Sequence, residues 1–252
     1  MNDSPERVVE PAGLAWKTLP LDGGGEAQLQ LYLTGRDGGP EAIRAQISEG
    51  YTVEPHFHYA AQFQVLLAGS MAFPLVRLDA PAVHYTEHNT PYGPFTVSGG
   101  HDMLVLHAKP GGVAVMRDKK RRWQANVRGR ELTRCAHEVE WQPMPGFEHA
   151  RRKLLIPPSF GPTAELVAFP AGVEFTPPVP EYGRYEVVYS GSASFLGGRL
   201  EPKALRFIPG GEQATPFTAG PEGVSMIFVS FDQDANYSDA GSTQDVLARM
   251  EQ

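Results

Sequence analysis

The chain has 252 residues, of which 41% are hydrophobic and 20% charged, which is enough to bury one large core or two small ones. Its 22 basic and 29 acidic residues give a net charge of -7, so no overall positive field draws it to nucleic acid or to an anionic membrane. A single cysteine, Cys135, excludes an intramolecular disulfide, and no apolar run approaches the roughly 20 residues that span a bilayer. Because the N-terminus has no apolar signal core, we expect a cytoplasmic protein.

Short apolar runs separated by turns rich in glycine and proline dominate the chain and predict β-strands. The clearest runs are Phe63 to Leu67, Met103 to Leu106, Tyr185 to Tyr189 and Met226 to Phe231. Strands of this length and spacing predict an all-β sandwich or barrel. One short helix is expected at the C-terminus, where Ser242 can cap a turn that precedes Val246 and Leu247.

An internal repeat organises these strands into two copies. Shifting the sequence by 122 residues superposes 33–96 on 155–218 without a gap and gives 16 identities in 64 positions. Many of the matches are glycines and prolines, which determine backbone geometry. The repeat predicts two domains of one kind, 1–125 and 126–252.

The segment 117–134 between the copies contains the only charge run, with eight arginines and lysines. It has two interpretations: an anion or nucleic-acid patch around Trp123, or a solvated strand and connector whose charge offsets an acidic body. We favour the connector, because no second basic segment or aromatic platform accompanies it.

Two histidines form the centre of the predicted chemistry. His56 and His58 are separated by one residue, so on an extended strand both side chains lie on one face and can share an ion. They stand between Gly50 and Gly69, with Gln62 four residues beyond His58. This arrangement resembles the first motif of the cupin superfamily, in which glutamate is usual at the position of Gln62. Together with the repeat, the resemblance implies two tandem cupin double-stranded β-helix, or jelly-roll, barrels.

The second cupin motif implies a fourth ligand. In the second copy the turn Pro209-Gly-Gly211 leads to Ala214 at the ligand position, and the repeat carries that position onto Tyr92 in the first copy. The resemblance therefore implies His56, His58, Gln62 and Tyr92 as metal ligands, with Tyr92 also a candidate proton donor.

The second copy has Pro178, Pro180, Arg184 and Ala214 at the corresponding four positions, so this motif offers no metal site there. Arg184 either pairs with Glu186 on the same strand face, which we favour, or holds a carboxylate ligand.

Further polar residues near the motif have open roles. His84 and His88 precede Tyr92 by eight and four residues, but Pro91 interrupts a continuous strand. Glu54 shares strand parity with the histidine pair and is a better carboxylate candidate than Glu87.

We therefore expect a metal-dependent bicupin enzyme, a dioxygenase or other oxidoreductase, that acts on a small and partly apolar organic molecule. One divalent transition metal ion per chain, Fe, Mn, Ni or Zn, is the expected cofactor. The alternatives are a non-catalytic small-molecule-binding or sensor cupin, and a cupin isomerase or lyase. Expected partners are the small-molecule substrate and a second copy in a homodimer, with neither nucleic acid nor membrane.

Overall fold

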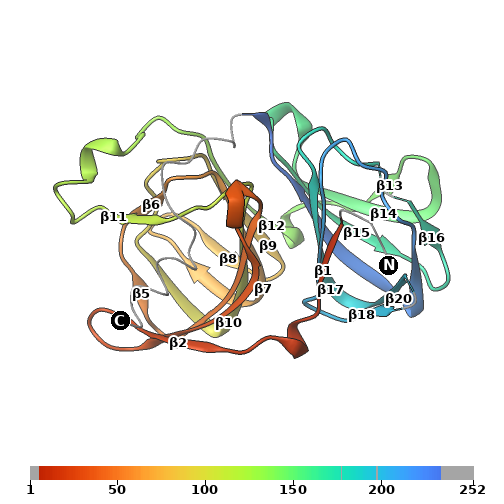
Figure 1. Cartoon of the computed structure of the whole chain (residues 1–252), viewed down its shortest axis with the longest axis horizontal. Helices are drawn as coiled ribbons and strands as arrows, with labels where there is room; N and C mark the ends of the chain where they lie inside the picture. Colours follow the sequence, from red (N-terminus) through yellow and green to blue (C-terminus); the bar gives the residue numbers. More distant parts are fainter. Residues whose placement is uncertain (1–5, 177, 197, 234–252) are drawn as a thin grey trace. The chain divides into compact units, whose positions relative to one another are not determined.

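The computed structural model describes residues 6–176, 178–196 and 198–233, drawn in colour in Figure 1. In this part of the chain the regular structure consists of β-strands and short 3-10 turns, which confirms the expected all-β class. The turns are η1 (Pro11–Gly13), η2 (Arg36–Gly38), η3 (Arg122–Gln124), η4 (Ala136–Glu138) and η5 (Pro158–Phe160). No helix among these residues has the length and apolar content needed to cross a membrane. The expected C-terminal helix at Ser242 lies outside the described residues.

The first compact unit comprises residues 14–135. Its strands are β2 (Lys17–Pro20), β3 (Glu26–Thr34), β4 (Glu41–Ile47), β5 (Thr52–Val53), β6 (His56–His58), β7 (Gln62–Ala72), β8 (Arg77–Asp79), β9 (Ala82–Thr86), β10 (Phe95–His107), β11 (Val113–Val115) and β12 (Glu131–Cys135). The main antiparallel sheet runs β12-β9-β7-β10-β4-β3-β2, with β8 beside β7 and β5 beside β10. Strands β6 and β11 form a separate pair, and the apolar core includes Leu66, Met71 and Phe95.

The second compact unit combines residues 6–13 with 136–232. Its strands are β1 (Arg7–Val9), β13 (Gln142–Met144), β14 (Phe147–Ile156), β15 (Thr163–Phe169), β16 (Glu174–Phe175), β17 (Arg184–Phe195), β18 (Gly198–Leu200), β19 (Leu205–Ile208) and β20 (Phe217–Ser230). They pair in the order β1-β19-β17-β20-β15-β14-β13, with β16 beside β20 and β18 beside β17. This order repeats that of the first unit strand for strand, and the core is built around Phe169, Phe175 and Phe217.

The limits of the two units differ from the predicted ranges 1–125 and 126–252. Strand β12 lies beyond residue 125 but pairs with β9, and so completes the sheet of the first unit. Strand β1 lies at the N-terminus but pairs with β19, at the corresponding edge of the second unit. Each sheet edge is thus covered by a segment outside the repeated region, and such cover is what protects an edge strand from improper pairing.

Strand β6 has no counterpart among the described residues of the second unit. Pro178 and Pro180 stand where the first unit has His56 and His58. Proline has no backbone N–H, so a strand with prolines at alternate positions cannot form a ladder on that side.

Candidate functional site

Strand β6 places the histidine pair at the rim of the first unit. His56 pairs with Val115 and His58 with Val113 on β11, while the backbone of His56 also bridges to Tyr92. The imidazole rings of His56 and His58 lie 5.4 Å apart, and His56 is only 7% exposed. The strand therefore brings both side chains to one face, as the one-residue spacing predicts.

Tyr92 links His56 to Gln64 through a chain of hydrogen bonds. His56 Nδ1 lies 2.7 Å from the carbonyl oxygen of Glu54, which can only accept, so Nδ1 carries the proton. His56 Nε2 is then a bare lone pair, and the Tyr92 hydroxyl 2.7 Å away donates to it. The Tyr92 oxygen in turn accepts a hydrogen bond from Gln64 Nε2 at 2.9 Å. The repeat assigned Tyr92 to the position of the fourth candidate ligand. In the structure Tyr92 contacts His56 directly.

Gln62 lies fully buried on β7, in the same chamber. Its Nε2 donates to Thr86 Oγ1 at 3.0 Å, and its Oε1 has no hydrogen-bond partner among the described residues. Burial raises the pKa of the Tyr92 phenol. Hydrogen bonds from Gln62 and Gln64 to Tyr92 partly oppose this rise. Because burial dominates, the Tyr92 hydroxyl stays protonated in the metal-free protein.

Two further histidines line the same interior. His84 faces Gln64 across the β7–β9 ladder, and its ring lies 5.1 Å from the Tyr92 ring. Its Nδ1 contacts Thr133 Oγ1 at 2.8 Å. His107 at the end of β10 faces Gln62, lies 5.1 Å from the His58 ring and approaches Glu41 Oε2 at 3.1 Å.

Burial keeps the imidazoles of His56, His58 and His84 uncharged. It lowers the pKa of His84 to about 3, with a smaller contribution from nearby His56. Burial also lowers the pKa of His56, and it brings that of His58 well below its usual value with the help of His107 and His56. These imidazoles are therefore neutral at pH 7, which is the form that binds metal ions.

The role of His84 was open from the sequence, and neither Gln64 nor His107 was predicted to belong to the site. Gln64 carried a usable signal, because it lies two residues beyond Gln62 on a predicted strand and must share its face. His107 lies four residues beyond Met103 on β10. The two side chains therefore share a face of the strand, and Met103 belongs to the buried core.

The other candidate groups lie apart from this cluster. The Glu54 carboxylate is exposed and pairs with Arg117 at 3.1 Å, so its carbonyl and not its carboxylate serves His56. Glu87 pairs with Arg130 at 3.2 Å. The backbone carbonyl of His88 accepts a hydrogen bond from Thr90 Oγ1 at 3.5 Å.

Two cavities open beside the histidine pair. One of about 350 Å³ includes His56 in its wall, with the apolar side chains Tyr51, Val53, Val113 and Val115. The other, about 480 Å³, reaches Tyr92. Arg117 and Glu54 line both cavities, and Arg117 also pairs with Asp22. A small, partly apolar molecule fits the dimensions and lining of the first cavity.

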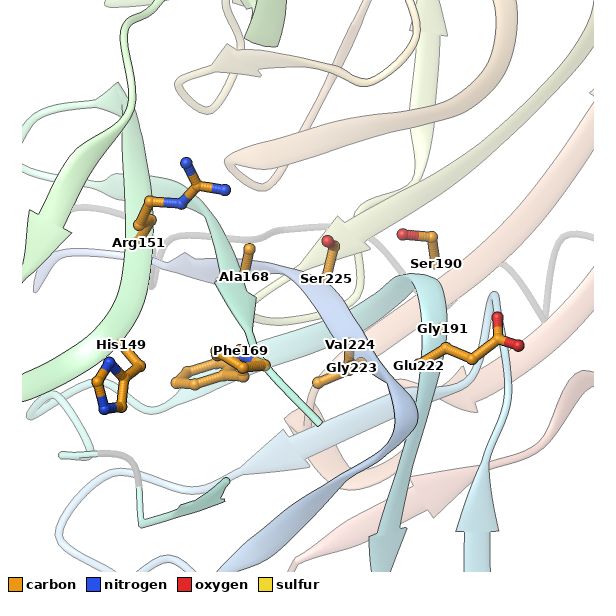
Figure 2. A pocket seen from close by; sticks show the side chains of 11 residues that line it. His149, Arg151, Ala168, Phe169, Ser190, Gly191, Glu222, Gly223, Val224 and Ser225 are labelled. Carbon is orange, nitrogen blue, oxygen red and sulfur yellow. The ribbon is translucent and has the colours of Figure 1, made fainter. Parts of the chain in front are cut away.

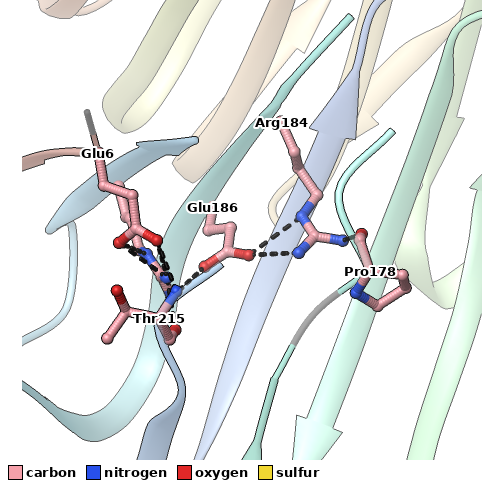
Figure 3. Close-up of polar contacts among 6 residues, drawn as sticks. Glu6, Pro178, Arg184, Glu186 and Thr215 are labelled. Carbon is pink, nitrogen blue, oxygen red and sulfur yellow. Dashed lines mark hydrogen bonds and ion pairs between the residues drawn. The ribbon is translucent and has the colours of Figure 1, made fainter. Parts of the chain in front are cut away.

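A network of charged side chains is buried in the second unit, beside its apolar core (Figure 3). Arg184 donates through Nε and Nη2 to Glu186 Oε1 at 3.0 and 2.7 Å, which confirms the favoured pairing. Arg206 contacts the other Glu186 oxygen at 3.3 Å. Ala214 is buried and offers no donor. The position that carries a candidate ligand in the first unit thus carries an ion pair in the second.

A shallow cavity of about 240 Å³ lies elsewhere in the second unit, on strands β14, β15, β17 and β20. Figure 2 shows Arg151, Ala168, Ser225 and Ser190 in one row and His149 beside Phe169. Its floor is made of small side chains, and it contains no set of converging donors comparable to that around Tyr92.

The basic segment 117–134 lies within the first unit, and its last residues, 131–134, belong to strand β12. Arg117, Arg121 and Arg130 each pair with a carboxylate, of Asp22, Asp118 and Glu87 respectively. Trp123 is 78% exposed and no described aromatic ring stacks on it. These contacts favour the interpretation as a solvated strand and connector.

No protein-family model and no curated protein sequence matches the chain. Solved structures do match. A candidate dioxygenase from Nostoc punctiforme has a TM-score of 0.73 at 13% identity, over 92% of this chain and 85% of that one. Lactobacillus farciminis oxalate decarboxylase has a TM-score of 0.65 at 12% identity, over 98% and 92%. The 11S globulin of Wrightia tinctoria has a TM-score of 0.60 at 12% identity, over 90% and 84%.

These neighbours are cupin-fold proteins, and the chain shares their fold: an all-β protein with two cupin barrels. At 12–13% identity the likeness extends to the fold alone, and both enzymes and a globulin share it.

Proposed function

We propose that the first barrel, residues 14–135, binds one divalent transition metal ion and is an oxidoreductase, of the dioxygenase type, for a small and partly apolar organic molecule. His56, His58, Gln62 and Tyr92 would hold the ion. The observation that supports this most strongly is the 2.7 Å contact of His56 Nδ1 with the Glu54 carbonyl, which assigns the proton to Nδ1 and leaves Nε2 as a lone pair facing Tyr92. A backbone carbonyl orients metal-binding histidines in the same way.

The chemistry of the donors fits a metal ion. Neutral imidazoles suit Fe, Ni, Cu and Zn. His58 Nδ1 and Gln62 Oε1 are buried without hydrogen-bond partners in the described structure, and buried unpaired acceptors are costly unless a ligand satisfies them. Within residues 14–135, no three His, Cys, Asp or Glu side chains bring ligand atoms within 4.8 Å of one another. The amide and phenol oxygens would therefore have to complete the set.

A bound ion would supply Lewis acidity or one-electron chemistry toward the substrate. The chain's own residues then have separate tasks. Tyr92 holds a proton on its hydroxyl, which donates to His56 Nε2 at 2.7 Å, and this proton is available to a group that binds beside it. Tyr51, Val53, Val113 and Val115 give the adjoining cavity an apolar wall on the substrate side. Arg117 joins Asp22 and Glu54 in an ion-pair network that lines the same cavity.

Elemental analysis tests the metal. Protein purified without a chelator should contain about one transition metal ion per chain, and His56→Ala and His58→Ala should lose it. His149→Ala, at an exposed histidine of the second unit, is the matched control. Full metal content in His56→Ala would place the ion elsewhere. Oxygen-uptake screening of the metal-loaded protein with small aromatic and keto compounds then tests the dioxygenase assignment.

A non-catalytic small-molecule-binding protein is the second candidate. It is favoured by the neutral amide at position 62, since no carboxylate joins His56 and His58 in the cluster. A metal-free protein that binds small organic molecules in the 350 Å³ cavity would establish this alternative. The homodimer and the cytoplasmic location stay predictions, and light scattering on the purified chain measures the first.

A further inference from the structure

The second barrel contains four buried charges that balance in pairs. Arg206 and Glu186 have fully buried side chains, that of Glu6 is 1% exposed and that of Arg184 is 7% exposed. Charges this deep require partners, because their desolvation is expensive. The two carboxylates are held in different ways.

Glu186 is a fixed part of the barrel. It belongs to the long strand β17, and its two oxygens contact Arg184 on the same strand and Arg206 on the adjacent β19. Its partners therefore come from the ladder that builds the sheet. Arg184 is further held by the Pro178 carbonyl, at 2.7 Å, as Figure 3 shows.

Glu6 reaches its partners from outside this ladder. Its carboxylate binds Arg206 through both oxygens, with Nη2 at 2.9 Å and Nε at 3.1 Å. The backbone N–H of Thr215 donates to the same carboxylate at 2.6 Å. A guanidinium fork and a main-chain N–H thus form an anion pocket, and this donor set recognises any carboxylate.

The segment that delivers Glu6 is lightly attached. Strand β1 has three residues and pairs only with β19. Arg7 and Val8 are exposed and Val9 is partly exposed, so β1 adds no residue to the buried core. Strand β12, at the same place in the first unit, has five residues and ends in buried Cys135. Elements with few buried apolar contacts open at low cost in free energy.

We propose that Arg206 and the Thr215 N–H form a carboxylate-binding site in the second barrel, and that Glu6 is its exchangeable internal ligand. A small organic acid would take the place of the Glu6 carboxylate while β1 separates from β19. Because Glu6 is tethered, its effective concentration is in the millimolar range or above, so a free monocarboxylate must reach tens of millimolar to compete.

The first test removes the internal ligand in the full-length chain. Glu6→Ala should unfold at a lower temperature than wild type in sodium chloride. Sodium formate at equal ionic strength should then raise its Tm by about 5 °C or more in a saturable manner. Glu10→Ala, on the same segment but outside the pocket, and Glu6→Ala/Arg206→Met should respond to formate no more than to chloride. If formate and chloride act alike on Glu6→Ala, the site binds no free carboxylate.

The second test uses the wild-type chain, so it does not depend on the folding of a variant. Hydrogen exchange of the β1 amides should quicken in sodium formate relative to sodium chloride, while exchange in β14 and β15 stays unchanged. If hydrogen exchange of the β1 amides stays unchanged up to molar formate, formate does not displace the Glu6 carboxylate. The network would then be purely structural.

Discussion

The Tyr92 hydroxyl both donates to His56 and accepts from Gln64, so a single oxygen joins two strands of the first barrel. Its removal leaves a buried imidazole lone pair and a buried amide N–H without partners. Such groups cost free energy whether or not a metal ion is present. Tyr92 therefore has a structural role that must be separated from any role toward an ion.

Tyr92→Phe should lower the free energy of unfolding of the metal-free protein by about 1–3 kcal/mol, because it orphans these two groups. Urea denaturation measures the change. Tyr189→Phe, at a partly buried tyrosine of the second unit, should cost less than about 0.5 kcal/mol. Added metal should lower the pKa of the Tyr92 phenol and produce tyrosinate absorbance that Tyr92→Phe lacks. Metal that binds both proteins equally and produces no such absorbance would remove Tyr92 from the site.

Gln62→Glu should tighten metal binding by about 10-fold, since it adds a charged oxygen at the buried Oε1 that now lacks a partner. Isothermal titration measures the affinity. Gln142→Glu, at an exposed position of the second unit, controls for the added charge. Equal affinity in wild type and Gln62→Glu would place residue 62 outside the ligand set.

Part of this cluster was predictable from local rules. Strand parity placed His56 and His58 on one face, and the repeat placed Tyr92 near them. The contact of Gln62 with Thr86 required the register of β7 against β9, and that of Gln64 with Tyr92 required the bridge between Tyr92 and His56. These contacts join residues 24 and 28 positions apart, and no single-sequence pattern states them.

At the level of strands, the repeat was informative because its glycines mark close backbone approaches. Gly69 and Gly191 both have φ near +72°, at 72° and 73°. A Cβ atom at Gly69 would collide with the carbonyl oxygen of Ser98, and one at Gly191 with that of Gly223. Both strands therefore require glycine at the same bend, where the long strands β10 and β20 pass.

Gly69→Ala and Gly191→Ala should each destabilise the protein by about 2–5 kcal/mol, since left-handed strain and a backbone clash add. Gly50→Ala is the matched control: φ is +73° there too, but nothing lies within 4 Å of the added Cβ. It should cost about 1 kcal/mol. Chemical denaturation compares the three, and equal losses would show that the close approach has no effect.

The bend of β10 also buries a histidine. His101 is 3% exposed, and neither ring nitrogen has a hydrogen-bond partner in the described structure. Burial lowers its pKa to about 4, against the opposing influence of Asp102 and Glu49. The unfolded chain therefore takes up a proton near pH 6.5 that the folded chain refuses until about pH 4.

Stability should consequently fall as pH drops through this window, by about 1.4 kcal/mol per pH unit from His101 alone. His101→Gln should remove this contribution, so the free energy of unfolding should fall less steeply between pH 6.5 and pH 4. Denaturation at several pH values measures the difference. His137→Gln, at an exposed histidine, should leave the slope unchanged. Identical pH profiles for His101→Gln and wild type would contradict the buried neutral state.

At the scale of the whole chain, the strand order repeats between the units while the contents of their interiors diverge. The repeat predicted the shared strand order. It did not predict the pairing of β1 with β19, because the paired residues lie about 200 positions apart in sequence. A three-residue strand without a buried side chain has no hydrophobic pattern to detect.

The divergence predicts the metal stoichiometry: at most one ion per chain. In the second barrel the guanidinium groups of Arg184 and Arg206 repel a cation, and they already occupy the oxygens of Glu186. Pro178→His/Pro180→His should therefore create no second site, because the two buried arginines remain. Titration with elemental analysis should give the same single equivalent for wild type and this double variant. Two equivalents in the wild type would mean that the second barrel binds metal through groups other than the four repeat positions.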